Sequence, residues 1–131
     1  MNETPKIFIS YCQDQKKMKD CFKALLEDMG FDPVVFDHGH PHNPLETEIS
    51  LIRDCVVLLG ILTPDLRLAG DEFQPSTSVI TEITIAFTHA KVVQLFAIND
   101  VDFSKLQFVN VNTVSHVFTN SKKLSNDDDV V

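Results

Sequence analysis

Polar residues that could take part in chemistry come directly after four apolar runs of this sequence. They are the groups Ser10-Tyr11-Cys12, Asp37-His38-Gly39, Thr63-Pro64-Asp65 and Asn99-Asp100. When apolar runs form the strands of an open parallel sheet, ligands bind just outside the carboxyl ends of those strands. We therefore expect these groups to border a binding site, provided that the runs are parallel strands.

Three histidines alternate with other residues at His38, His40 and His42. Imidazoles at such spacing could bind a transition metal. Carboxylate or cysteine ligands at a supporting spacing are not evident, and we predict no metal site here. Gly39 and Pro41 indicate a shaped loop instead.

The familiar nucleotide and hydrolase motifs are missing. The sequence has no Gly-x-Gly-x-x-Gly after its first apolar run and no phosphate-binding Gly-Lys-Ser/Thr. It also lacks the Gly-x-Ser-x-Gly turn that carries a nucleophilic serine. These absences argue against a dinucleotide-dependent dehydrogenase, a P-loop enzyme and an α/β-hydrolase.

The elements that must position the polar residues alternate along the chain. Apolar, β-rich runs predict strands at 6–11, 33–36, 55–62 and 91–98, with a weaker strand at 112–118. Apolar residues spaced three and four apart predict helices at 15–29 and 45–54. Segments that contain glycine and proline predict loops at 37–44 and 63–75. The segment from Ser76–Ser78 to Ala90 is rich in β-branched residues, but it is the only crossover available between two parallel strands, so we predict a helix. A short helical piece is expected near 103–106.

Alternating strands and helices predict an α/β fold with a flavodoxin-like, doubly wound, open parallel sheet of five strands and helices on both faces. The 131 residues suffice for one such core. We expect residues 1–120 to form the domain and residues 121–131, which hold three consecutive aspartates, to form a flexible tail or the start of a linker.

Charge, hydropathy and cysteine content indicate which partners and which cell compartment to expect. The formal net charge of -8 would repel phosphate backbones, so we expect no nucleic-acid binding. No apolar run approaches the roughly 20 residues that span a bilayer. The first residues do not resemble a signal peptide. The odd count of three cysteines indicates reduced thiols, and we therefore predict a cytoplasmic protein with no membrane contact.

Several segments resemble those of TIR domains when they are taken in order. They are 8–11 (FISY), 25–31 (LLEDMGF), 34–37 (VVFD), 52–59 (IRDCVVLL), 81–86 (TEITIA) and 91–93 (KVV). The resemblance covers roughly residues 6–118, and its specificity comes from the order and spacing of the segments. One departure lies in the stretch before Glu82, where many TIR domains place a tryptophan or cysteine. This sequence has no tryptophan, and Ser78 lies one turn before Glu82.

The resemblance implies an enzyme that cleaves the bond between nicotinamide and ribose in NAD+, giving ADP-ribose or cyclised products, in signalling or antiviral defence. Glu82 then corresponds to the catalytic glutamate, and NAD+ is a substrate, with no cofactor needed. A single carboxylate near the ribose could stabilise the oxocarbenium-like transition state. Ser10, Tyr11, Phe36, Asp37 and Ser78 are the expected substrate-binding residues.

Other interpretations of these residues stay open. Glu82 could be an exposed helix glutamate, Phe36 a core residue and Ser78 a helix cap. The resemblance also allows a non-enzymatic adaptor, in which the loop after the second strand mediates self-association between TIR domains and further domains or partner proteins complete the assembly. A third possibility is an enzyme like the nucleoside deoxyribosyltransferases, which exchange bases.

Overall fold

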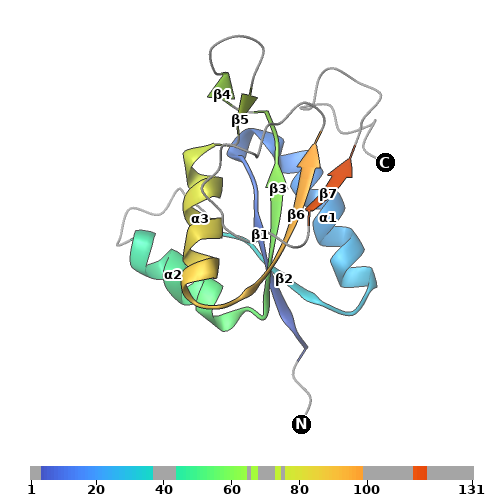
Figure 1. The fold of residues 1–131 in the computed structure, drawn as a ribbon. Coiled ribbons are helices and arrows are strands. Elements are labelled where there is room, and N and C mark those ends of the chain that lie inside the picture. The colour runs from blue at the N-terminus through green and yellow to red at the C-terminus, as the bar shows by residue number, and fades with distance from the viewer. Residues whose placement is uncertain are drawn as a thin grey trace.

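Short runs rich in branched and aromatic side chains form a parallel sheet (Figure 1). The computed structural model describes residues 4–36, 44–64, 66–67, 73–74, 76–98 and 114–117. The strand order is β2-β1-β3-β6-β7, and each neighbouring pair is parallel. Four strands form the body of the sheet: β2 (Asp32–Val34), β1 (Lys6–Ser10), β3 (Val57–Leu62) and β6 (Val92–Ile98). The short β7 (Val114–Val117) pairs with β6 at the edge. The predicted α/β class with an open parallel sheet is confirmed.

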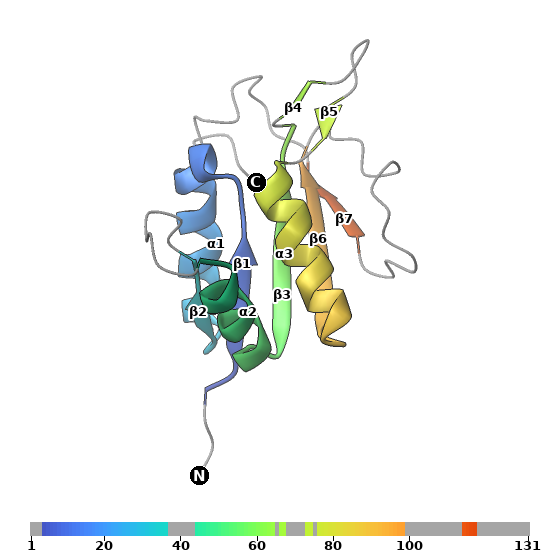
Figure 2. The ribbon, with the colours of Figure 1, turned by 90° about the vertical axis from the view of Figure 1, so that its left-hand side faces the viewer.

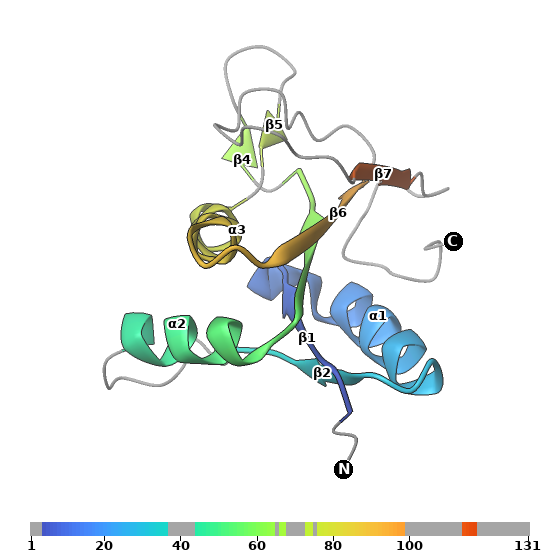
Figure 3. The same ribbon diagram turned by 60° about the horizontal axis from the view of Figure 1, so that its bottom comes forward.

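Helices cover both faces of this sheet, as predicted. A 3-10 turn, η1 (Gln13–Gln15), leads into α1 (Lys16–Asp28) on one face, whereas α2 (Pro44–Asp54) and α3 (Thr77–Thr88) lie on the other (Figure 3). The segment of α3 is helical despite its β-branched residues, because it must carry the chain across the sheet from β3 to the parallel strand β6. Gly30, just after α1, has a φ of 89°, the left-handed conformation expected of a helix-terminating glycine.

Two clusters of buried side chains hold the layers together. Alternation along β1 sends Phe8 into the cluster beneath α2 and α3, and Ile7 and Ile9 into the cluster beneath α1. Because both faces of the central strands are covered, β3 is almost continuously apolar, and five of its six residues are buried. The predicted strand at 55–62 therefore belongs at the centre of the sheet, although it begins at Val57.

Some sequence expectations differ from the structure. The second strand occupies Asp32–Val34 and not 33–36, because its pairing with β1 ends at Val34. The expected loop at 63–75 includes a small antiparallel pair, β4 (Leu66–Arg67) and β5 (Phe73–Gln74). The expected helical piece near 103–106, the histidines of 38–42 and the tail at 121–131 lie outside the described residues. Within the described ranges, no helix is long and apolar enough to cross a bilayer.

Candidate functional site

A buried hydrogen bond joins the first strand to the third helix. Ser10 Oγ, at the end of β1, donates to Glu82 Oε1 over 2.7 Å. The two residues are 0% and 2% exposed. Ser10 reaches the helix because it follows Phe8 by two positions and so points to the same face of the sheet. The interpretation of Glu82 as an exposed helix glutamate is therefore wrong. Ser10 and Glu82, both predicted as site residues, lie in direct contact.

A glycine sets the distance between α3 and the sheet at this level. Gly60 of β3 is paired with Ser10. A Cβ atom on Gly60 would lie 2.7 Å from Leu95 Cδ2 and 3.3 Å from Ile83 Cδ1. Packed carbon atoms do not approach so closely. Ile83 is the residue after Glu82, so the missing side chain at Gly60 lets α3 pack closely enough for Glu82 to reach Ser10.

A second glutamate joins this pair from α2. Glu48 is 7% exposed, and its side chain is hydrogen-bonded to that of Glu82. It precedes Ile52, which is 1% exposed, by one helical turn, so both side chains lie on the face of α2 that packs inward. Two carboxyl groups from different helices therefore meet beside a serine hydroxyl, in a region where the described residues contribute mainly apolar contacts.

Burial dominates the electrostatics of this group. Removal from water raises the pKa of Glu82 to about 8, the Ser10 hydrogen bond opposes that change, and the charge and hydrogen bond of Glu48 add to it. Burial also raises the pKa of Glu48, whereas its hydrogen bond with Glu82 lowers it. The hydrogen bond between the two carboxyl groups raises the pKa of Glu82 and lowers that of Glu48, so it favours Glu82 as the group that carries the proton.

The other predicted site residues are not all brought together. Tyr11 is 7% exposed and packs in the cluster beneath α1, with Lys19 Nζ 5.6 Å from its ring centroid. It lies across the sheet from Glu82. Phe36 is 4% exposed and belongs to the core beneath α2 and α3, as its alternative interpretation held. Asp37 lies outside the described residues.

Ser78 stands one turn before Glu82 on α3 and is half-buried. Its Oγ lies 3.2 Å from Ser76 Oγ, and the helix start at Ser76 has no side-chain cap hydrogen bond. Figures 1 and 2 show α3 starting at the end of the sheet where β3 and β6 finish. The start of α3, with Ser78, thus lies at the end of the sheet where ligands bind in open parallel folds.

Sequence reasoning missed Glu48 as a site residue. The signal that could have found it is its position on α2, four residues before the apolar Ile52 and three before Leu51. An acidic residue at a core-facing helical position is unusual, because a buried charge must be paired or neutralised.

Two buried amide atoms lie on the turn that follows β1. Gln13 Nε2 and Gln15 Oε1 have no hydrogen-bond partner within the described part of the chain. Unsatisfied buried polar atoms are rare, so a partner from outside the protein is one explanation for them. They follow Ser10 by three and five residues, in the turn that comes after the carboxyl end of β1.

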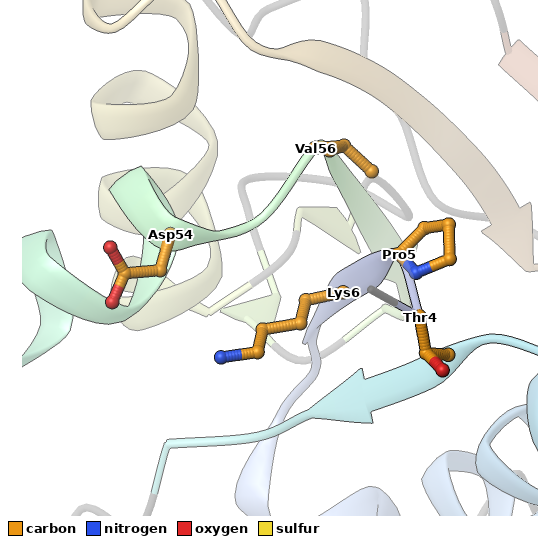
Figure 4. Close-up of a pocket in the computed structure, with 5 residues that line it drawn as sticks. All are labelled: Thr4, Pro5, Lys6, Asp54 and Val56. Atoms are coloured by element: carbon orange, nitrogen blue, oxygen red, sulfur yellow. The ribbon is translucent and has the colours of Figure 1, made fainter. Parts of the chain in front are cut away.

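A hollow of about 400 Å³ lies at the amino ends of the strands, opposite the end of the sheet where Ser10 lies (Figure 4). It is lined by five residues around the amino ends of β1 and β3. Thr4, Pro5 and Lys6 lie at the start of β1, Asp54 ends α2, and Val56 comes just before β3. The hollow is thus separated from Glu82 by the length of the strands, and it offers one lysine and one aspartate where the carboxyl end offers two paired glutamates. Within the described residues, no group of three or more histidine, cysteine, aspartate or glutamate side chains could hold a metal ion.

Comparisons with known proteins support the fold. No protein-family model and no curated protein sequence matches this chain. Among solved structures, the chain is similar to a CMP N-glycosidase from Clostridium botulinum, BcmB, with a TM-score of 0.58 and 15% identity. The match covers 88% of this chain and 90% of that chain. At this identity the likeness shows a shared α/β architecture over nearly the whole of both chains.

Proposed function

We propose that this chain cleaves the N-glycosidic bond of a nucleotide, with Glu82 acting at the ribosyl group. The observation that carries the proposal is the buried contact of Ser10, Glu82 and Glu48 beside the carboxyl end of a parallel sheet. The similarity in fold to an N-glycosidase supports it, and so does the resemblance of 81–86 to the helix on which TIR enzymes carry a glutamate.

The chemistry asks little of the protein beyond placement and electrostatics. When the bond between C1′ and the base nitrogen breaks, positive charge develops on the ribosyl ring, as in glycoside hydrolysis. Carboxyl groups fixed in a water-poor region act more strongly on such a charge than the same groups in water. Glu82 and Glu48 are fixed in this way because each is buried and each is hydrogen-bonded to a neighbour.

Two substrates define the first experiment. NAD+ is the substrate that the TIR resemblance proposes, with release of nicotinamide and formation of ADP-ribose or a cyclised product. CMP is the substrate named for the structural neighbour, with release of cytosine. Both reactions break a bond between a base and a ribosyl carbon, so the general proposal covers both.

The test measures base release by chromatography after incubation with NAD+, CMP and the other common nucleoside monophosphates. The wild-type chain is compared with Glu82→Gln and with Glu27→Gln, which changes an exposed glutamate of α1. We expect the wild-type chain to release at least one base. For a substrate that needs the carboxyl, Glu82→Gln should lower the rate of release about 100-fold or more, and Glu27→Gln should leave it unchanged. Assays are repeated at high protein concentration, because the TIR resemblance also implies self-association.

Base release that is absent for every substrate, or equal in wild type and Glu82→Gln for every substrate, would overturn the proposal. If the inert chain self-associated as its concentration rose, the result would favour the assembly module. Exchange of bases between deoxynucleosides without hydrolysis would favour the deoxyribosyltransferase-like enzyme.

A further inference from the structure

We infer that Glu48 keeps the Glu82 carboxyl protonated so that Glu82 can donate this proton to the departing base, and that the substrates are nucleotides with an uncharged base. This inference rests on the proposed function and refines it. It makes Glu82 an acid and Glu48 a positioning residue, and it ranks CMP-like substrates above NAD+.

The arrangement of donors and acceptors requires a shared proton. An ionised carboxylate has only acceptors, so two glutamates can be hydrogen-bonded to each other only when one carries a proton. Ser10 does not supply that proton, because its hydroxyl is already donated to Glu82 Oε1. The pair Glu48–Glu82 therefore contains at least one carboxylic acid.

Burial decides which of the two is the acid. Glu82 is 2% exposed and Glu48 is 7% exposed. The charge that acts on Glu82 among the described residues comes from Glu48 on α2, and β1 contributes the uncharged hydroxyl of Ser10. With a negative neighbour and little water, Glu82 is the group that stays neutral. Burial, the charge of Glu48 and the hydrogen bond with Glu48 thus favour a proton on Glu82, and they outweigh the opposing hydrogen bond from Ser10.

The reaction that follows is balanced without any added group. The C1′–N bond breaks and its electron pair goes to the base, while the proton of Glu82 moves to a nitrogen or conjugated oxygen of that base. Water then adds to C1′, and its proton returns to the Glu82 carboxylate. The products are the free base and the sugar phosphate with a hydroxyl at C1′, and both glutamates end as they began.

This acid matters only for a base that is poor at leaving on its own. An uncharged base such as cytosine would depart as an anion unless it receives a proton, whereas nicotinamide already departs neutral from its cationic bond. A protonated Glu82 therefore accelerates cleavage of CMP-like substrates and contributes little to cleavage of NAD+.

The test compares pH profiles of base release from CMP and NAD+ by the wild-type chain. With CMP, kcat/KM should fall about tenfold per pH unit above about pH 8, where Glu82 loses its proton. With NAD+, no such fall should occur, and kcat/KM should be lower than with CMP. The wild-type comparison needs no variant, so it remains informative if a substitution unfolds the chain.

Variants of Glu48 test its positioning role. Glu48→Gln removes the negative neighbour of Glu82. The fall of kcat/KM for CMP at high pH, which we call the alkaline limb, should therefore begin about one pH unit lower. Glu48→Asp should restore its position in part. Glu46→Gln, which changes an exposed glutamate of the same helix, should leave the limb in place. A purely structural role for Glu48 would lower stability without moving the limb.

The failures of the two proposals are distinguishable. Two results would overturn the inference and leave the N-glycosidase proposal standing. One is Glu82-dependent release of nicotinamide with NAD+ preferred over CMP. The other is an alkaline limb that does not move in Glu48→Gln. Absence of base release from every substrate would overturn both.

Discussion

Replacement of Glu82 by glutamine should make the folded chain more stable in alkaline solution. Glutamine has the size and shape of a protonated glutamate. Its carbonyl can accept the hydrogen bond from Ser10, and its amide can donate to the Glu48 carboxylate, as the acid does. It differs in having no proton to lose, so it avoids the cost of ionising a buried group.

The magnitude follows from the proton balance of folding. Native Glu82 keeps its proton up to about pH 8, whereas the unfolded chain loses it near the ordinary pKa of 4.5. In this window the native state binds more protons than the unfolded state, so the wild-type free energy of unfolding falls as pH rises. Between about pH 5.5 and about pH 8.5 the loss amounts to about 3 kcal/mol for this residue.

Urea denaturation followed by circular dichroism at these two pH values measures the effect. The wild type should lose more stability between them than Glu82→Gln, by about 3 kcal/mol. The exposed-site variant Glu27→Gln should follow the wild type. Equal losses in wild type and Glu82→Gln would show that Glu82 is ionised in the native state, and this would refute the reasoning. A variant uniformly less stable at both pH values would instead measure imperfect packing of the amide.

Further predictions follow from the neighbours of Glu82 and from the core. Ser10→Ala removes the hydrogen bond that lowers the pKa of Glu82, so the alkaline limb with CMP should move upward, and urea denaturation should show a loss of about 1–3 kcal/mol; a downward shift would contradict this. Gly60→Ala should cost about 1–3 kcal/mol in thermal unfolding by crowding α3, and an unchanged midpoint would show that the crowded side chains yield freely. The Cys55 thiol is buried, and burial raises its pKa to about 11. It should react with a disulfide reagent only after unfolding, whereas exposed Cys21 reacts in the native chain; peptide mass spectrometry would reveal early labelling of Cys55.

Much of the fold followed from local pattern. The run in β3 is apolar throughout, and only a strand covered on both faces needs that composition. The identity of α3 did not follow from propensity, and it was obtained from the rule that parallel strands require a crossover. Leu25, Met29 and Leu45 lie in the segments predicted as helices, yet they are exposed, so an apolar residue at helical spacing need not be covered.

The site was only partly predictable. Ser10 and Tyr11 are adjacent in an extended segment, so their side chains point to opposite faces of the sheet, and only one of them could contact Glu82. The role of Glu48 depended on how α2 rotates against α3, which is decided by tertiary packing and not by any local signal. The pKa of Glu82 likewise depends on burial that only the assembled layers create.

The Ser10–Glu82 bond also bears on how the chain folds. Its partners are 72 positions apart, and it can form only after β1, β3 and α3 have come together. Closing so long a loop is entropically costly and slow compared with forming a single helix. In refolding experiments, the raised pKa of Glu82 should therefore return with the last cooperative phase. The proton held between the two helices would then report the completion of the native structure, and a partly folded chain would lack it.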